Sequence, residues 1–96
     1  MTAEQIAAAK LWLRISTDAL DEEIGQTVDA CLLDLHNAGV VNTPWDDALI
    51  KQAVKLYCKA QFGYNADSDK FAKSYEYLKC ALALSGDYSS DATKKA

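Results

Sequence analysis

A helix start signal and a helix stop signal frame the segment TPWDDALIKQAVKLYCKAQFG, which runs from Thr43 to Gly63. The Thr43 hydroxyl is suited to cap the first turn, and Pro44 suits the first helical position because no N–H is needed there. Two aspartates follow where the helix dipole favours negative charge. Gly63 suits the left-handed residue that ends a helix. The apolar side chains between these signals cover nearly half of a helical wheel: Leu49, Ile50, Ala53, Val54, Leu56, Tyr57 and Ala60.

A surface helix usually carries a narrower apolar stripe than this one. We therefore expect residues 44–62 to form a central helix that packs on more than one side. A preceding helix is predicted over residues 18–37, with Thr17 or Asp18 as its cap and Gly39 as its end. Because only a short connector separates the two helices, they should form an antiparallel hairpin.

Two outer helices complete the predicted fold. The first runs from Thr2 to about Leu13, and Thr2 and Gln5 fit a capping box at its start. The last begins at one of the polar residues 67–69 and runs to about Ser85. The predicted fold class is thus all-α, a small four-helix bundle with a central antiparallel helical hairpin. Residues 1–86 form the helical domain, and residues 87–96 form a flexible C-terminal tail because they are polar and lack periodicity.

The last helix carries two apolar stripes on opposite sides. Phe71, Tyr75, Leu78 and Leu82 form the stripe that should face the core. The other stripe consists of Tyr77, Cys80, Ala81 and Leu84. A small monomer seldom uses two such stripes, so the second indicates a partner surface. Loosely placed surface apolar residues are the alternative. On the earlier helices, Leu33 points away from the buried stripe, and Trp12 should pack on another element or on another subunit.

Charge divides the chain into two unlike halves. The net charge is −4, with −7 carried by residues 1–47 and +3 by residues 48–96. Either the halves attract within one fold, or neighbouring copies meet acidic face to basic face. Lys51, Lys55 and Lys59 form a row at i, i+4 and i+8 on the central helix. This row is either a solvated face or a contact with acidic protein surface or with passing DNA, and it would give no base specificity.

Signatures of catalysis are absent from the sequence. It has no glycine-rich phosphate loop, no HExxH or GxSxG motif and no paired cysteine–histidine arrangement. Its three cysteines are widely spaced and His36 is the single histidine, so neither a metal site nor a disulfide framework is expected. No run approaches the length of a membrane span, and because the opening MTAEQ lacks a basic region, no signal peptide is expected. We expect a soluble protein that is made in a cytoplasm, with no enzymatic activity and no cofactor.

Three segments in order resemble the small head–tail connector, or adaptor, proteins of long-tailed bacteriophages, which are often labelled DNA-packaging proteins. The segments are LWLRIS with the helix DALDEEIGQTVDACLLDL, then ALIKQAVKLYCKAQFGYN, then SDKFAKSYEYLKCALALSGDY. The likeness covers about residues 8–88 and consists of helical patterns rather than a catalytic signature. The family's usual Leu-Arg-Ile-Asp here reads Leu-Arg-Ile-Ser, a minor departure because serine also caps helices.

The resemblance implies a structural virion protein at the head–tail junction. About twelve copies would form a homo-oligomeric ring under the portal protein, extend the DNA channel, and offer a docking surface to the next tail-side connector or stopper protein. DNA would pass without sequence-specific binding, and no membrane would be involved. The candidate contact residues are Trp12, Leu33, Lys51, Lys55, Lys59, Tyr77, Cys80 and Leu84, and the tail after Gly86 is the candidate portal contact. The alternative is a small helical DNA-binding, packaging or regulatory protein, although the acidic total weighs against it. A small hydrolase is discounted because no nucleophile–base pair is present.

Overall fold

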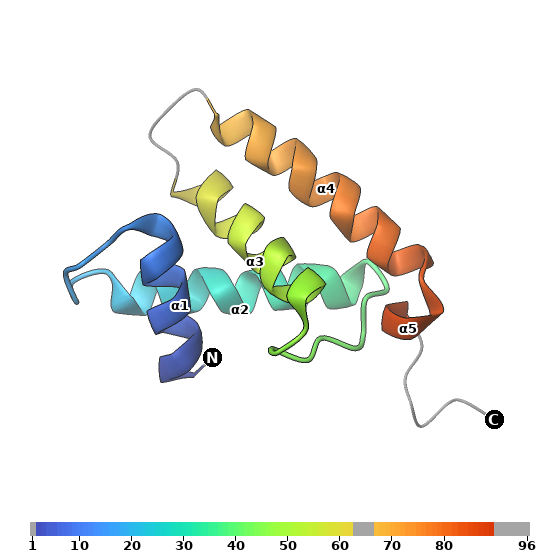
Figure 1. Cartoon of the computed structure of the whole chain (residues 1–96), viewed down its shortest axis with the longest axis horizontal. Helices are drawn as coiled ribbons and strands as arrows, with labels where there is room; N and C mark the ends of the chain where they lie inside the picture. The colour runs from blue at the N-terminus through green and yellow to red at the C-terminus, as the bar shows by residue number, and fades with distance from the viewer. Residues whose placement is uncertain (1, 63–66, 90–96) are drawn as a thin grey trace.

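The computed structural model describes residues 2–62 and 67–89, and within these ranges the chain is all-helical with no strand (Figure 1). The helices, in chain order, are α1 (Ala3–Leu13), α2 (Asp21–Asn37), α3 (Ala48–Gln61), α4 (Ser68–Leu84) and α5 (Gly86–Ser89). The predicted all-α class is confirmed, and the four long helices correspond to the four that the sequence predicts. The short α5 is an addition.

Helix α3 lies at the centre of the molecule, as its wide apolar face predicts. It packs against α1, α2 and α4, and α4 covers its outer side (Figure 1). Helices α2 and α3 run in broadly opposite directions across the connector of residues 38–47. The side chains that α3 buries completely are Ile50, Ala53, Val54 and Cys58, and α2 meets them with Ile24, Val28, Cys31 and Leu35.

The start of α3 differs from the prediction. Asp47, rather than Thr43, is the N-cap, and its Oδ1 accepts the backbone N–H groups of Leu49 at 2.8 Å and Ile50 at 3.2 Å. Pro44 lies before the helix, where its carbonyl accepts the Asp47 N–H in a turn. The carboxylate wins because it satisfies two free amides of the first turn at once.

The start of α2 also differs from the prediction. The helix begins at Asp21, and its cap position, Leu20, makes no side-chain capping bond. Asp18 cannot serve as the cap because its carboxylate lies 2.6 Å from Lys10 Nζ, and the Thr17 hydroxyl accepts the Ala19 N–H in a local turn. The far end agrees with the prediction. Gly39 follows the helix with φ +105°, a conformation that glycine adopts without strain.

The two chain ends give one confirmation and one correction. At α1, Thr2 and Gln5 form the predicted capping box, with both bonds at 3.1 Å. Residues 87–89, expected to begin the tail, instead belong to α5. They dock because the Tyr88 carbonyl accepts the N–H groups of Val41 at 2.9 Å and Asn42 at 3.0 Å. The predicted stop at Gly63, the following turn and the tail residues 90–96 lie outside the described residues.

Candidate functional site

Helix α4 has two apolar faces, one turned toward the core and the other exposed to solvent. Tyr75 and Leu82 of the inward stripe are buried, whereas Phe71 and Leu78 are half-buried. On the outward stripe, Tyr77 is 80% exposed and Leu84 is 88% exposed, and Cys80 and Ala81 are also exposed. A helical period of 3.6 residues places both stripes as the sequence indicates. The outward stripe therefore lies on the surface with no partner among residues 2–62 and 67–89, and its use as an interface stays a prediction.

The other two apolar contact candidates lie in different settings. Leu33 is 60% exposed on α2. Trp12 is half-buried, because its ring packs on Trp45 with centroids 5.9 Å apart and planes tilted by 40°. Both indoles pack against the buried core. Of the two partners considered for Trp12, the structure shows another element of the same chain.

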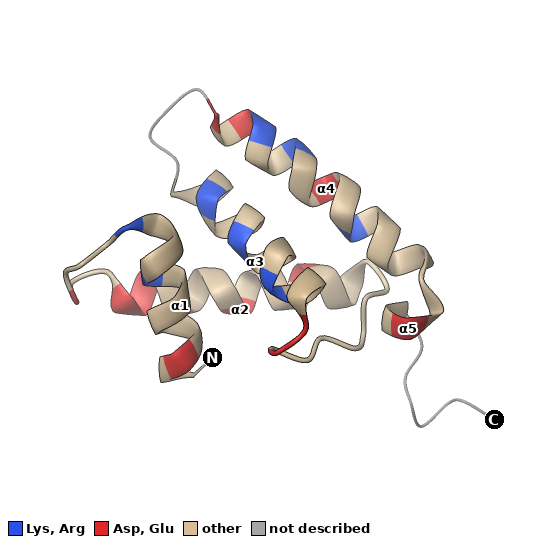
Figure 2. Ribbon diagram, in the orientation of Figure 1, with Lys and Arg blue, Asp and Glu red and all other residues tan. Residues whose placement is uncertain are grey.

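The lysine row follows α3 as the spacing predicts, and Figure 2 shows its three blue bands along that helix. The three side chains are only partly exposed. Lys59 Nζ lies 5.4 Å from the centre of the Phe71 ring on α4, a cation–π contact. Lys51 and Lys55 form no ion pair within residues 2–62 and 67–89. Their positive charge is therefore left for a partner surface or for solvent.

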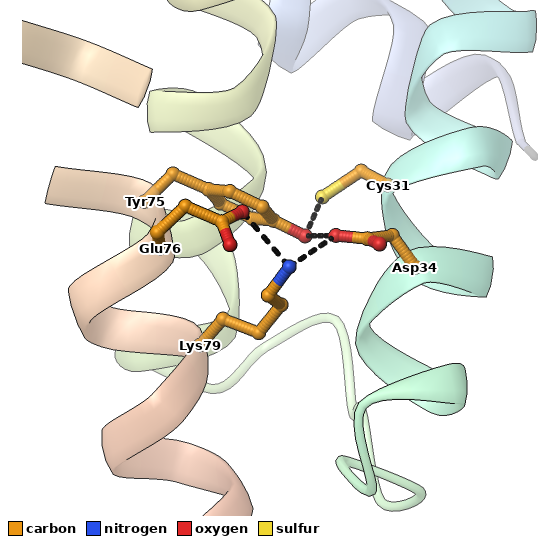
Figure 3. A network of polar contacts seen from close by, with 5 residues as sticks. All are labelled: Cys31, Asp34, Tyr75, Glu76 and Lys79. Carbon is orange, nitrogen blue, oxygen red and sulfur yellow. Dashed lines mark hydrogen bonds and ion pairs between the residues drawn. The ribbon is translucent and has the colours of Figure 1, made fainter. Parts of the chain in front are cut away.

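A polar network that sequence reasoning missed joins α2 to α4 (Figure 3). The Tyr75 hydroxyl donates to Asp34 Oδ2 at 2.6 Å, and Lys79 Nζ donates to the same oxygen at 3.0 Å. Lys79 also pairs with Glu76 at 2.8 Å, and Cys31 Sγ lies 3.9 Å from the tyrosine oxygen. The network fixes α4 to α2 with charge-assisted bonds.

Burial and hydrogen bonding shift the pKa values of two members of this network, Tyr75 and Asp34. Burial is the main reason that the pKa of Tyr75 is raised, so the hydroxyl stays protonated and able to donate. The hydrogen bond from Tyr75 is the main reason that the pKa of Asp34 is lowered, so the carboxylate stays charged. Tyr75 stood out only as a core residue in the sequence, since its partner lies 41 residues earlier.

A second missed contact holds α5 to the start of α3. The Tyr88 hydroxyl lies 2.9 Å from Asp47 Oδ2 and 3.1 Å from Oδ1, so one carboxylate both caps α3 and receives α5. This hydrogen bond is the main reason that the pKa of Asp47 is lowered. The short helix therefore closes the connector between α2 and α3 rather than starting a tail.

The cysteines fall into two classes. Cys31 and Cys58 are buried, and burial raises the pKa of each thiol to about 12, which makes both poor nucleophiles. Cys80 is exposed on the outward stripe of α4. In the part of the chain that the structure describes, no group of three or more His, Cys, Asp or Glu side chains could hold a metal ion. No described helix has the length and apolar character needed to cross a membrane.

These features define a small helical protein that keeps an apolar helix face and a basic row on its surface, a class suited to assembly with other proteins. A family model described as phage connector protein matches residues 6–89. The chain therefore belongs to the phage connector protein family, as the segments quoted from its sequence predict. Its role is structural, at the junction of head and tail, and it is a virion component. No curated protein matches it, and no solved structure does.

Proposed function

We propose that this chain forms a ring of about twelve copies under the portal, lengthens the DNA channel toward the tail and presents a docking surface to the next tail-side protein. The observation that supports it most is the outward stripe of α4. Tyr77 and Leu84 leave large apolar surfaces in water on a chain of 96 residues, an arrangement typical of a protein–protein contact.

Charge supports the passive handling of DNA in this proposal. The chain carries a net charge of −4, and its acidic side chains repel the phosphate backbone rather than hold it. The α3 lysines are too few to grip a duplex against this balance, and one of them already covers Phe71. DNA would therefore slide along such a ring without sequence-specific contact.

Negative-stain imaging of the protein mixed with the portal protein of its own phage tests the proposal. We expect rings on the portal with the wild type, and their loss with the double variant Tyr77→Asp/Leu84→Asp, because each exposed side chain can change without disturbing the core. Ala72→Asp is the matched control, since Ala72 is exposed on the same helix outside the stripe. Portal particles without a ring in the wild-type mixture would refute the function.

A gel-shift at moderate salt tests the DNA-binding alternative separately. A connector is expected to leave short duplex DNA unretarded. Retardation of such a duplex at moderate salt would favour the alternative instead, because weak backbone contacts are lost there.

A further inference from the structure

The outer side of α1 is hollowed, and the described part of the chain leaves it open to solvent. Leu11 is 79% exposed there. A hollow of about 480 Å³ borders it, lined by Ala7, Lys10, Leu11, Arg14, Ile15 and Ser16. A smaller hollow of about 170 Å³ shares Ala7 and Lys10 with the first and continues toward Ala3. We call the two together the α1 groove. Apolar side chains at its centre and cations at its side are features of a site for an amphipathic helix.

The two cationic side chains beside the α1 groove differ in their ion pairs. Lys10 Nζ is held by Asp18 at 2.6 Å and by Asp21 at 2.9 Å. Arg14 lies at the end of α1 in the left-handed conformation, with φ 58°, and is exposed. Its guanidinium makes no ion pair within the described parts of the chain. One positive charge is therefore free beside an apolar hollow.

The outward stripe of α4 has the spacing that such a groove accepts. Tyr77, Cys80, Ala81 and Leu84 lie at positions i, i+3, i+4 and i+7 of one helix, the anchor pattern of a helix laid in a groove. The stripe ends at the negative end of the α4 dipole, whose last turn has no basic residue. Exposed Asp87 adds a negative charge three residues beyond Leu84.

We propose that the outward stripe of α4 in one copy docks in the α1 groove of the next copy, with the C-terminal end of α4 and Asp87 facing Arg14. The two surfaces are apolar at the centre and opposite in charge at the edge. Figure 1 places α1 toward one end of the long axis and the C-terminal end of α4 toward the other. One chain therefore cannot satisfy both surfaces itself, whereas a head-to-tail row of copies can.

A contact between unlike surfaces is heterologous, and it closes into a ring when the rotation between copies allows. The inference rests on the proposed function only in that it names the contact between ring neighbours. The competing occupant is a second α4 stripe, packed face to face in a two-fold dimer. The two arrangements differ in what a thiol cross-link would produce.

Cys80 provides the cross-linking handle, because it is exposed and the two other thiols are buried. In the variant Ala7→Cys, each chain carries two accessible thiols, one in the stripe and one in the α1 groove. A bifunctional thiol reagent applied to the full chain at high concentration, with and without its portal, should then produce a ladder of dimers, trimers and longer chains. The wild type has one reactive thiol per chain and can yield dimers at most.

Three matched variants complete the test. Gln52→Cys puts a second exposed thiol on α3, at a position that belongs neither to the stripe nor to the lining of the α1 groove, and should give no ladder. Ala7→Cys/Cys80→Ser should lose the ladder. Ala7→Cys/Leu84→Asp should lower the ladder yield by about tenfold or more, since a charge is costly in an apolar contact. Circular dichroism checks that each variant keeps its helices.

The outcomes separate the contact from the function. A ladder specific to Ala7→Cys supports the contact whether or not rings form on the portal. Dimers alone, or an equal ladder from Gln52→Cys, overturn the contact, as does the absence of any product. Rings on the portal without the ladder leave the proposed function standing and refute the contact. A ladder without rings refutes the function alone.

Discussion

Removal of the Tyr75 hydroxyl should destabilise the fold, whereas removal of the Tyr77 hydroxyl should not. Tyr75→Phe keeps the buried ring and leaves no cavity, so the change removes only the hydroxyl, with its 2.6 Å bond to Asp34 and its weak 3.9 Å contact with Cys31 Sγ. Hydrogen bonds to charged groups contribute roughly 1.5–3 kcal/mol to stability. Tyr77 is exposed on the same helix, two residues away, and makes no hydrogen bond among the described residues, so Tyr77→Phe is the matched control.

The bond between Tyr75 and Asp34 should contribute at the low end of this stability range, for a structural reason. The Asp34 side chain is 41% exposed and keeps its bond to Lys79, so water and the ammonium partly replace the lost donor. We therefore expect Tyr75→Phe to lower the free energy of unfolding by about 1.5 kcal/mol. For a domain of this size the melting temperature should fall by roughly 6–12 °C. Urea and thermal unfolding, followed by circular dichroism at pH 7, measure both quantities.

The pH dependence of this difference checks the attribution. The hydrogen bond from Tyr75 is the first cause of the lowered pKa of Asp34. A lowered folded pKa gives stability that is present above the unfolded pKa, about 3.9, and is lost as the pH falls through the folded value. The stability gap between wild type and Tyr75→Phe should thus narrow in acid. A gap under about 0.5 kcal/mol at pH 7, or one that persists unchanged in acid, would refute the reasoning.

Three further variants or reagents test other parts of the molecule. Asp47→Ala should cost more stability than Tyr88→Phe in urea unfolding, because it removes the α3 cap as well as the bond to α5; an equal loss would show that the cap contributes nothing. Charge reversal of the three α3 lysines should impair ring assembly or docking in negative-stain images, and normal particles would contradict the charge-pairing hypothesis. A thiol reagent should label Cys80 rapidly in the native protein and the two buried thiols only after denaturation; a second fast thiol in the native state would contradict their burial.

Periodicity placed the long helices and both sides of α4 because these depend on spacing along one segment. The 3.6-residue period alone decides that Leu82 turns inward and Leu84 outward. The Thr2–Gln5 capping box was predictable for the same reason, since its two members are three residues apart. Contacts between residues this close in the chain can be predicted from the local sequence.

The starts of α2 and α3 and the polar pairs were not predictable, because residues outside the local segment decide them. Asp47 caps α3 and also binds Tyr88, 41 residues further on, and Asp18 is taken from its capping role by Lys10. The bond between Tyr75 and Asp34 spans the same separation of 41 residues. When several polar residues near a helix start can serve as its cap, the tertiary partner selects one. The sequence shows which residues could cap a helix, but it does not show which distant residue will bind each of them.

The polar network and the outward stripe lie on the same helix, which links stability to assembly. The bonds of Tyr75 and Lys79 to Asp34 fix α4 on α2 and so hold Tyr77 and Leu84 in a defined row. A preorganised surface loses less conformational entropy on binding. Tyr75→Phe should therefore weaken assembly and stability together, whereas the Tyr77→Asp/Leu84→Asp double variant weakens assembly alone. If Tyr75→Phe lowers the melting temperature while ring yield on the portal stays at the wild-type level, the network anchors the fold without ordering the contact face.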